Sequence, residues 1–187
     1  MKTASKLDTL LTPVGKIAFM AITKPVAKFT GDGSEYVVRL EFDLSDPEVQ
    51  AFRTTIEDLN ASKVVVGKAD ANVGNTMNAK VPAGKMQVAF KTAYTREDGT
   101  LAQPTVLDSN GNRLTGEDIP QFHSELDSGL AQVEAAVSTA GKHPTLYLRQ
   151  VAIIELTQGE RAEIAAQESD LQVALKRTHA KNSIKSN

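Results

Sequence analysis

The chain has 187 residues, 41% of them hydrophobic, and a formal net charge of -2 at pH 7. This length and composition support one substantial hydrophobic core, so we expect one domain with appendages. The chain contains no cysteine, which excludes disulfides, thiolate metal sites and cysteine nucleophiles.

Two strands are predicted in the first quarter of the chain. Residues 15–23 (GKIAFMAIT) are rich in apolar and β-branched side chains and predict a strand that stops before Pro25, since proline lacks the ladder donor. After a Gly/Asp turn, residues 36–43 (YVVRLEFD) alternate apolar and polar side chains. This alternation predicts a half-buried strand with Tyr36 and Phe42 in the core.

A helix and a loop follow. In residues 45–61, Ser45 or Asp46 precedes Pro47 as a capping residue, and apolar side chains recur at helical spacing. This pattern predicts an amphipathic helix of about three turns. Residues 67–84 are rich in Gly, Asn and other small residues, which predicts a surface loop, either functional or a plain connection.

The second half of the chain predicts further strands and a final helix. Residues 85–97 form a strand pattern, and residues 103–116 contain a strong Asp/Asn/Gly turn between apolar pairs, which indicates a short hairpin. The runs 128–140 and 145–157 should pair antiparallel, because a short turn joins them. Residues 159–178 place apolar side chains near one helical face, with acids first and bases last.

This order of elements predicts a mainly β protein rather than a βαβ fold. Our first expectation is an OB-fold-like five-stranded antiparallel barrel with one inserted helix and a C-terminal helix. A β-sandwich fits the same pattern. We expect residues 1–158 to form the barrel domain and residues 159–187 to form the C-terminal helix and a basic tail.

Charge is unevenly distributed along the chain. Residues 1–28 and 61–91 each carry five lysines and one acid, whereas residues 29–60 and 97–134 each carry eight acids and few bases. If the fold gathers the positive segments on one face, the protein has a basic groove despite its negative net charge. The alternative is an ordinary surface of mixed charge.

The sequence carries no signature of a catalytic or nucleotide-hydrolysing site. It has no phosphate-binding glycine loop, dinucleotide fingerprint or nucleophile elbow. The histidines stand singly, without a metal-binding spacing: His123, His143 and His179. Acids cluster at Asp43, Asp46 and Glu48 and again at Glu117 and Asp118, but the first group suits helix capping and the second a loop. We expect no enzyme activity, no metal and no cofactor.

One predicted strand combines aromatic and basic side chains. In residues 86–96, apolar side chains such as Phe90 alternate as in a core strand, while Lys91, Tyr94 and Arg96 lie among and after them. A single-strand-binding protein needs this combination, because cations pair with phosphates and exposed rings stack on bases. An ordinary strand, with its cations facing solvent, explains the pattern too.

Four segments, in this order, carry a resemblance to a known family: TKPVAKFTGDGSEYVVRLEFD, GKMQVAFKTAYTREDGT, PTVLDSNGNRLTG and LYLRQVAIIEL. Across residues 15–156, about three quarters of the chain, the sequence resembles the OB-fold single-stranded DNA-binding proteins encoded by tailed bacteriophages. The resemblance is to the short-tailed coliphage type, without its acidic C-terminal tail, since this chain ends in KRTHAKNSIKSN.

The resemblance implies a protein that coats and protects single-stranded DNA without sequence preference during phage DNA replication and recombination. It implies the cytoplasm of the bacterial host cell as the location, and it allows for phage replication proteins as partners and for a homo-oligomer. No apolar run approaches the roughly 20 residues that span a bilayer, so we expect no membrane association. A structural or adaptor β-domain of a virion and a metal-dependent nuclease remain the alternatives.

In an OB barrel the ligand crosses the face of the middle strands, where residues from several strands converge. The DNA-binding residues predicted on this basis are Lys24, Lys28, Phe29, Lys85, Lys91, Tyr94, Arg96, Tyr147 and Arg149. Lys16 and Arg39 rank below these as phosphate contacts.

Overall fold

The computed structural model describes residues 8–28, 33–59, 64–67, 81–93, 99–138 and 145–159. The chain divides into two units, residues 1–157 and residues 158–187. The predicted C-terminal helix, the basic tail and most of the predicted loop lie outside the described residues, and the predicted domain boundary stays a prediction.

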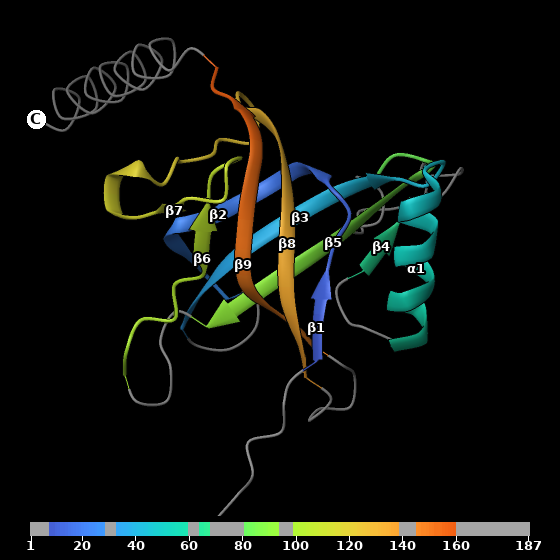
Figure 1. Ribbon diagram of the computed structural model, residues 1–187, viewed down its shortest axis with the longest axis horizontal. Coiled ribbons are helices and arrows are strands. Elements are labelled where there is room, and N and C mark those ends of the chain that lie inside the picture. The colour runs from blue at the N-terminus through green and yellow to red at the C-terminus, as the bar shows by residue number, and fades with distance from the viewer. Residues whose placement is uncertain are drawn as a thin grey trace, which may run out of the picture. The chain divides into compact units, whose positions relative to one another are not determined.

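Within the described residues, five strands close into a barrel (Figure 1). They are β2 (Gly15–Ala27), β3 (Ser34–Asp43), β5 (Lys85–Ala93), β8 (Ser128–Ser138) and β9 (Thr145–Thr157). Around the barrel, β2 pairs with β3, β3 with β5, β5 with β9, β9 with β8, and β8 again with β2. The contact between β5 and β9 is parallel and the other four are antiparallel. The OB-fold-like five-stranded barrel is therefore confirmed.

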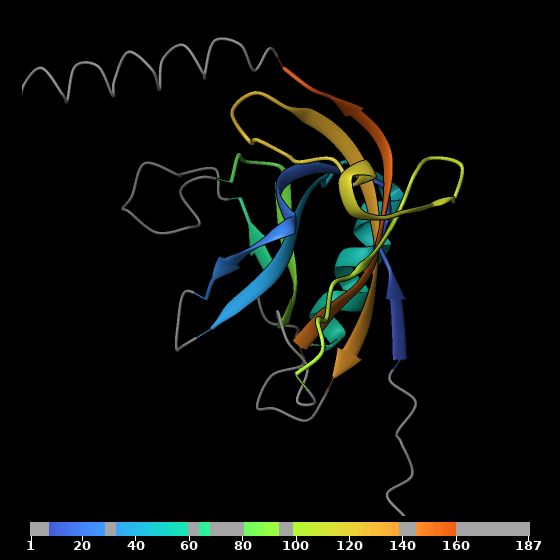
Figure 2. The same cartoon turned by 90° about the vertical axis from the view of Figure 1, so that its left-hand side faces the viewer.

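The barrel has two walls, each with an inward apolar side. Figure 2 shows β2, β3 and β5 on one side and β8 with β9 on the other. In β3 the inward residues are Tyr36, Val38, Leu40 and Phe42, and none is more than 3% exposed. Because strand side chains alternate between faces, the residues between them point outward. The assignment of Tyr36 and Phe42 to the core is confirmed.

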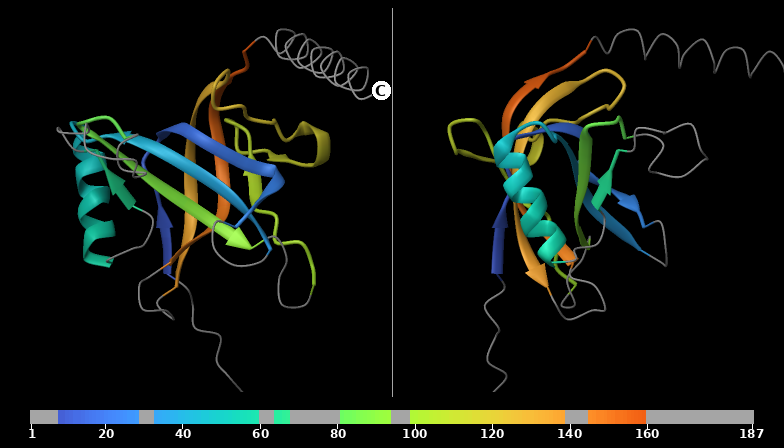
Figure 3. Two further views of the ribbon diagram at one scale, coloured as in Figure 1. Left: turned by 180° about the vertical axis from the view of Figure 1, so that it is seen from behind. Right: turned by 90° about the vertical axis from the view of Figure 1, so that its right-hand side faces the viewer.

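The inserted helix, α1 (Pro47–Leu59), packs against the barrel where β3 ends (Figure 3). Its buried residues include Phe52, whose ring centroid lies 5.4 Å from that of Phe42. The Glu48 backbone N–H donates to Asp46 Oδ1 at 2.8 Å, so Asp46 is the cap and Pro47 takes the first helical position, where its missing N–H costs nothing.

The predicted hairpin is confirmed as β6 (Thr105–Leu107) and β7 (Arg113–Leu114). One carboxylate organises its turn, because Asp108 Oδ1 accepts the backbone N–H groups of Asn110 and Asn112, each at 2.8 Å. Hydrogen bonds from Asn112 lower the pKa of Asp108, and the bond from the Asn112 side chain has the largest effect. The hairpin joins the barrel wall through parallel pairing of β6 with β9, and a 3-10 helix (Gly116–Asp118) follows it.

Two short strands were not predicted from the sequence. They are β1 (Asp8–Leu11), which pairs antiparallel with β8, and β4 (Val64–Val66), which pairs antiparallel with β5. Neither is long enough for alternation to be recognised, and both depend on pairing with a long strand of the barrel.

The prediction that the first strand ends before Pro25 is wrong. The strand β2 continues to Ala27, but its ladder with β3 breaks after Ala21 and resumes at Val26. Pro25 lies inside this break, so its missing N–H removes no β2–β3 ladder bond.

Candidate functional site

The outward side chains of β2, β3 and β5 form one surface, which we call the outer barrel face. These three strands run side by side in Figure 3 (left). The outward positions are Lys16, Phe19 and Ala21 of β2, Glu35, Val37, Arg39, Glu41 and Asp43 of β3, and Lys85, Gln87, Ala89 and Lys91 of β5. Of these, Ala21, Val37 and Ala89 are buried, so the accessible part consists of the polar residues and Phe19. It combines cations, carboxylates and one aromatic ring on three neighbouring strands of the sheet.

A β-bulge places Phe19 on this surface. Ile17 pairs with Leu40 and Phe19 pairs with Arg39, so Ala18 is an extra residue in β2. Simple alternation would put Phe19 on the same side as Ile17, which is buried in the core. The bulge shifts the phase by one residue, so the half-buried Phe19 ring lies beside Arg39 on the outer barrel face.

Cross-strand ion pairs hold both lysines of β5 on this surface. Lys85 Nζ lies 2.5 Å from Asp43 Oδ2, and Lys91 Nζ pairs with Glu35 Oε1. Between them, Gln87 Nε2 donates to Glu41 Oε2 at 2.8 Å. The registers explain both lysine pairs: Asp43 lies directly opposite Lys85, and Glu35 lies two residues from the partner of Lys91. The Lys85–Asp43 pair is partly exposed, and such pairs contribute only about 0 to 1 kcal/mol, whereas the Lys91–Glu35 pair is more enclosed, with side chains 27% and 13% exposed.

The carboxylate of Asp43 stays ionised. The hydrogen bond from Lys85 is the main cause, and the Ser45 backbone N–H at 3.0 Å and the Ser45 hydroxyl at 2.7 Å add to it. Together they hold the pKa of Asp43 well below its usual range. The Lys85 ammonium therefore keeps an anionic partner to a lower pH than an ordinary aspartate would allow.

Tyr147 extends the outer barrel face onto β9. In the parallel contact of β5 with β9, Tyr147 pairs with Lys91, so the two residues lie side by side on the outside of the barrel. Tyr147 is 43% exposed. Arg149 is an extra residue in the β8–β9 ladder, and its Nη1 lies 3.9 Å from Glu134 Oε1 on the neighbouring strand β8.

The predicted site residues are only partly brought together. Lys91 and Tyr147 are neighbours, and Lys85 lies on the same face of β5, six residues from Lys91. Lys24 is exposed in β2, and Lys28 follows that strand, where its backbone N–H donates to Gly33 O at 3.1 Å.

Three predicted residues, Phe29, Tyr94 and Arg96, lie outside the described residues, so the site as a whole stays a prediction. The sequence analysis did not select Phe19 and ranked Arg39 low. The sequence signal for Phe19 was an aromatic residue in a predicted strand, but the bulge that turns this residue outward could not be predicted.

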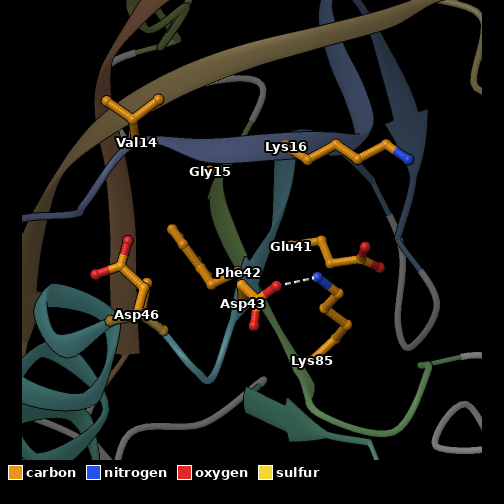
Figure 4. A pocket seen from close by; sticks show the side chains of 9 residues that line it. Val14, Gly15, Lys16, Glu41, Phe42, Asp43, Asp46 and Lys85 are labelled. Carbon is orange, nitrogen blue, oxygen red and sulfur yellow. Dashed lines mark hydrogen bonds and ion pairs between the residues drawn. The ribbon is translucent and has the colours of Figure 1, made fainter.

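Two small pockets border one end of the outer barrel face. The first has a volume of about 220 Å³ and is lined by Val14, Gly15, Lys16, Glu41, Phe42, Asp43, Asp46, Val49 and Lys85 (Figure 4). The second, of about 180 Å³, is lined by Lys16, Ser128, Gly129, Leu130 and Glu155. Lys16 lines both pockets.

Two of the five acids that suggested a metal site, Asp43 and Asp46, have other roles. Asp43 binds Lys85 and Ser45, and Asp46 caps α1. No group of three potential metal ligands occurs in the part of the chain that the structure describes. The described helices also include none long and apolar enough to cross a membrane.

Two solved structures of bacteriophage proteins share this architecture. The first is gp2.5, a single-stranded DNA-binding protein encoded by bacteriophage T7, with a TM-score of 0.60 and 17% identity over 86% of this chain and 94% of that chain. The second is the single-stranded DNA-binding protein from bacteriophage Enc34 in complex with single-stranded DNA. It gives a TM-score of 0.53 and 13% identity over 84% of this chain and 98% of that chain.

At the level of sequence, no family model and no curated protein matches the chain. The similarity lies in the three-dimensional fold and spans nearly the full length of both phage proteins. The chain therefore has the OB-fold-like barrel of phage single-stranded DNA-binding proteins, as the resemblance in its sequence predicted.

The bulge predicts a large loss of stability on truncating one phenylalanine and a small loss on truncating another in the neighbouring strand. Replacing Phe42, which is buried, with alanine should lower the free energy of unfolding by about 3 to 5 kcal/mol. The same change at the half-buried Phe19 should cost only about 1 kcal/mol, because the ring leaves no core cavity. Urea denaturation measures both, and equal losses would place Phe19 in the core and contradict the bulge.

Proposed function

We propose that this protein binds single-stranded DNA on the outer barrel face, without sequence preference and without catalysis. The observation that carries the proposal is the alternation of rings and cations across neighbouring strands: Tyr147 beside Lys91, and Phe19 beside Arg39. In proteins that bind single strands, such rings stack on bases and such cations pair with phosphates.

Lack of sequence preference follows from this chemistry. Every base has a face that can stack on an aromatic ring, and every nucleotide has the same phosphate. Selectivity for single strands follows as well, because stacking on a protein ring requires a base that is already unpaired. The net charge of -2 offers little general attraction to duplex DNA, whose nonspecific binding depends on neutralising many phosphates.

The phage proteins of the same fold support the proposal, and one of them was solved with single-stranded DNA bound. By the same reasoning, we propose that the protein coats and protects single-stranded DNA during phage replication and recombination in the cytoplasm of the bacterial host. Phage replication proteins are the partners that this role implies.

Preference for single strands is the first expected outcome. Titrating labelled single-stranded and duplex oligonucleotides of the same sequence, with and without magnesium, should show clearly tighter binding to the single strand and an intact oligonucleotide. Duplex binding of equal strength would contradict the proposal. Loss of the oligonucleotide in magnesium would support a nuclease, and no binding to either form would support a structural or adaptor β-domain.

Tyr147 offers a direct test of stacking. Replacing it with alanine should weaken single-strand binding by about 1 to 3 kcal/mol, while its 43% exposure predicts little change in melting temperature. Tyr147→Phe is the matched control and should retain most of the affinity, because it keeps the ring. A fall in melting temperature with unchanged affinity per folded molecule would assign Tyr147 to structure.

A further inference from the structure

The cations of the outer barrel face fall into two groups. Lys85 and Lys91 each form an ion pair with a carboxylate of β3. Arg39 and Lys16 form no ion pair with any part of the chain that the structure describes. The second group is available to an anionic ligand without displacing a carboxylate of the barrel.

The strand registers align three of these cations on a diagonal. Lys91 pairs with Val37, and Arg39 lies two residues further along β3. Lys16 pairs with Glu41, which lies two residues beyond Arg39 in the same direction. Each step, from Lys91 to Arg39 and from Arg39 to Lys16, therefore moves one strand across and two residues along. With strands roughly 4.8 Å apart and a rise of about 3.3 Å per residue, each step spans about 8 Å.

Aromatic rings accompany the same diagonal. Tyr147 lies beside Lys91 at one end, and Phe19 lies beside Arg39 in the middle. At the other end, Lys16 lines both small pockets. Flexible cations at regular steps, with rings beside them, match a chain of phosphates that carries bases on one side.

We propose that a single strand of DNA crosses the outer barrel face along this diagonal, from Tyr147 to Lys16, with Arg39 and Lys16 as its dominant phosphate contacts and Phe19 as an internal stacking ring. This inference rests on the proposed function and deepens it by assigning the path of the strand. It gives Arg39 and Lys16 a larger role than the sequence analysis did, and it adds the Phe19 ring, which the sequence analysis did not select.

The salt dependence of binding distinguishes the two groups of cations. When a phosphate binds Arg39 or Lys16, condensed counterions leave the DNA. Each such contact adds about 0.7 to the magnitude of the slope of log affinity against log salt concentration. A phosphate that binds Lys85 or Lys91 also frees a carboxylate, which attracts a cation from solution and partly offsets that release. Arg39 and Lys16 should therefore account for a larger share of the slope than the paired lysines do.

The test compares two double variants of the full chain in titrations of a labelled thymidine oligonucleotide at several salt concentrations. Combining Lys16→Gln with Arg39→Gln should lower the magnitude of the slope by about 1.4, the sum of two contacts. Combining Arg53→Gln on α1 with Arg113→Gln on β7 removes the same charge away from the outer barrel face and should leave the slope almost unchanged. Equal slopes in these two variants would overturn the diagonal, and an equal or larger fall in slope on combining Lys85→Gln with Lys91→Gln would overturn the dominance of Arg39 and Lys16.

A substitution at Phe19 tests the stacking ring separately. Phe19→Leu keeps an apolar side chain and removes the ring, so affinity should fall by about 5- to 100-fold at a fixed salt concentration with the salt slope unchanged. Unchanged affinity in a folded Phe19→Leu protein would remove Phe19 from the path. If the unaltered chain binds single-stranded DNA while both tests fail, only the path is wrong, whereas absence of binding by the unaltered chain contradicts the proposed function and the path together.

Discussion

Two glycines beside the contact of β8 with β2 allow the barrel to close tightly. Gly15 and Lys16 pair with Ala131 and Leu130, and this short contact completes the barrel. A Cβ atom on Gly15 would lie 2.6 Å from the ring of Phe42, and one on Gly129 would lie 2.6 Å from the backbone oxygen of Glu155. Only a residue without a side chain leaves room for the Phe42 ring beside β2 and for the backbone of β9 beside β8. Once the barrel is closed, its interior side is uniformly buried, whereas its outer side exposes charged residues and buries a few small ones such as Val37 and Ala89.

The strand register determines which charged residues lie together on the outer barrel face. Pairing of β3 with β5 brings the acids of one charge segment against the lysines of another, so Lys85 and Lys91 are partly neutralised within the protein. The positive segments of the sequence therefore do not add up to a uniformly basic groove. Among the described residues of this face, Lys16 and Arg39 are the cations that form no ion pair.

The sequence contained enough information to predict the barrel but only part of the candidate site. Strict alternation predicted the burial of Phe42, and the Asp/Asn/Gly turn predicted the hairpin around Asp108, because both signals are local. The continuation of β2 through Pro25 and the outward position of Phe19 could not be predicted, since each depends on a break in register that only the partner strand defines. The pairing of Lys91 with Glu35, 56 residues earlier in the chain, likewise requires the tertiary fold.

The central claim is that single-stranded DNA lies on the outer barrel face. Backbone amide chemical shifts of the isotope-labelled full chain, followed during titration with a thymidine oligonucleotide, test this claim most directly. The largest changes should fall in residues 16–21, 35–43 and 85–91 and around Tyr147, with little change in α1 or in the hairpin of β6 and β7. Changes concentrated on α1 and that hairpin, with the outer barrel face unaffected, would contradict it.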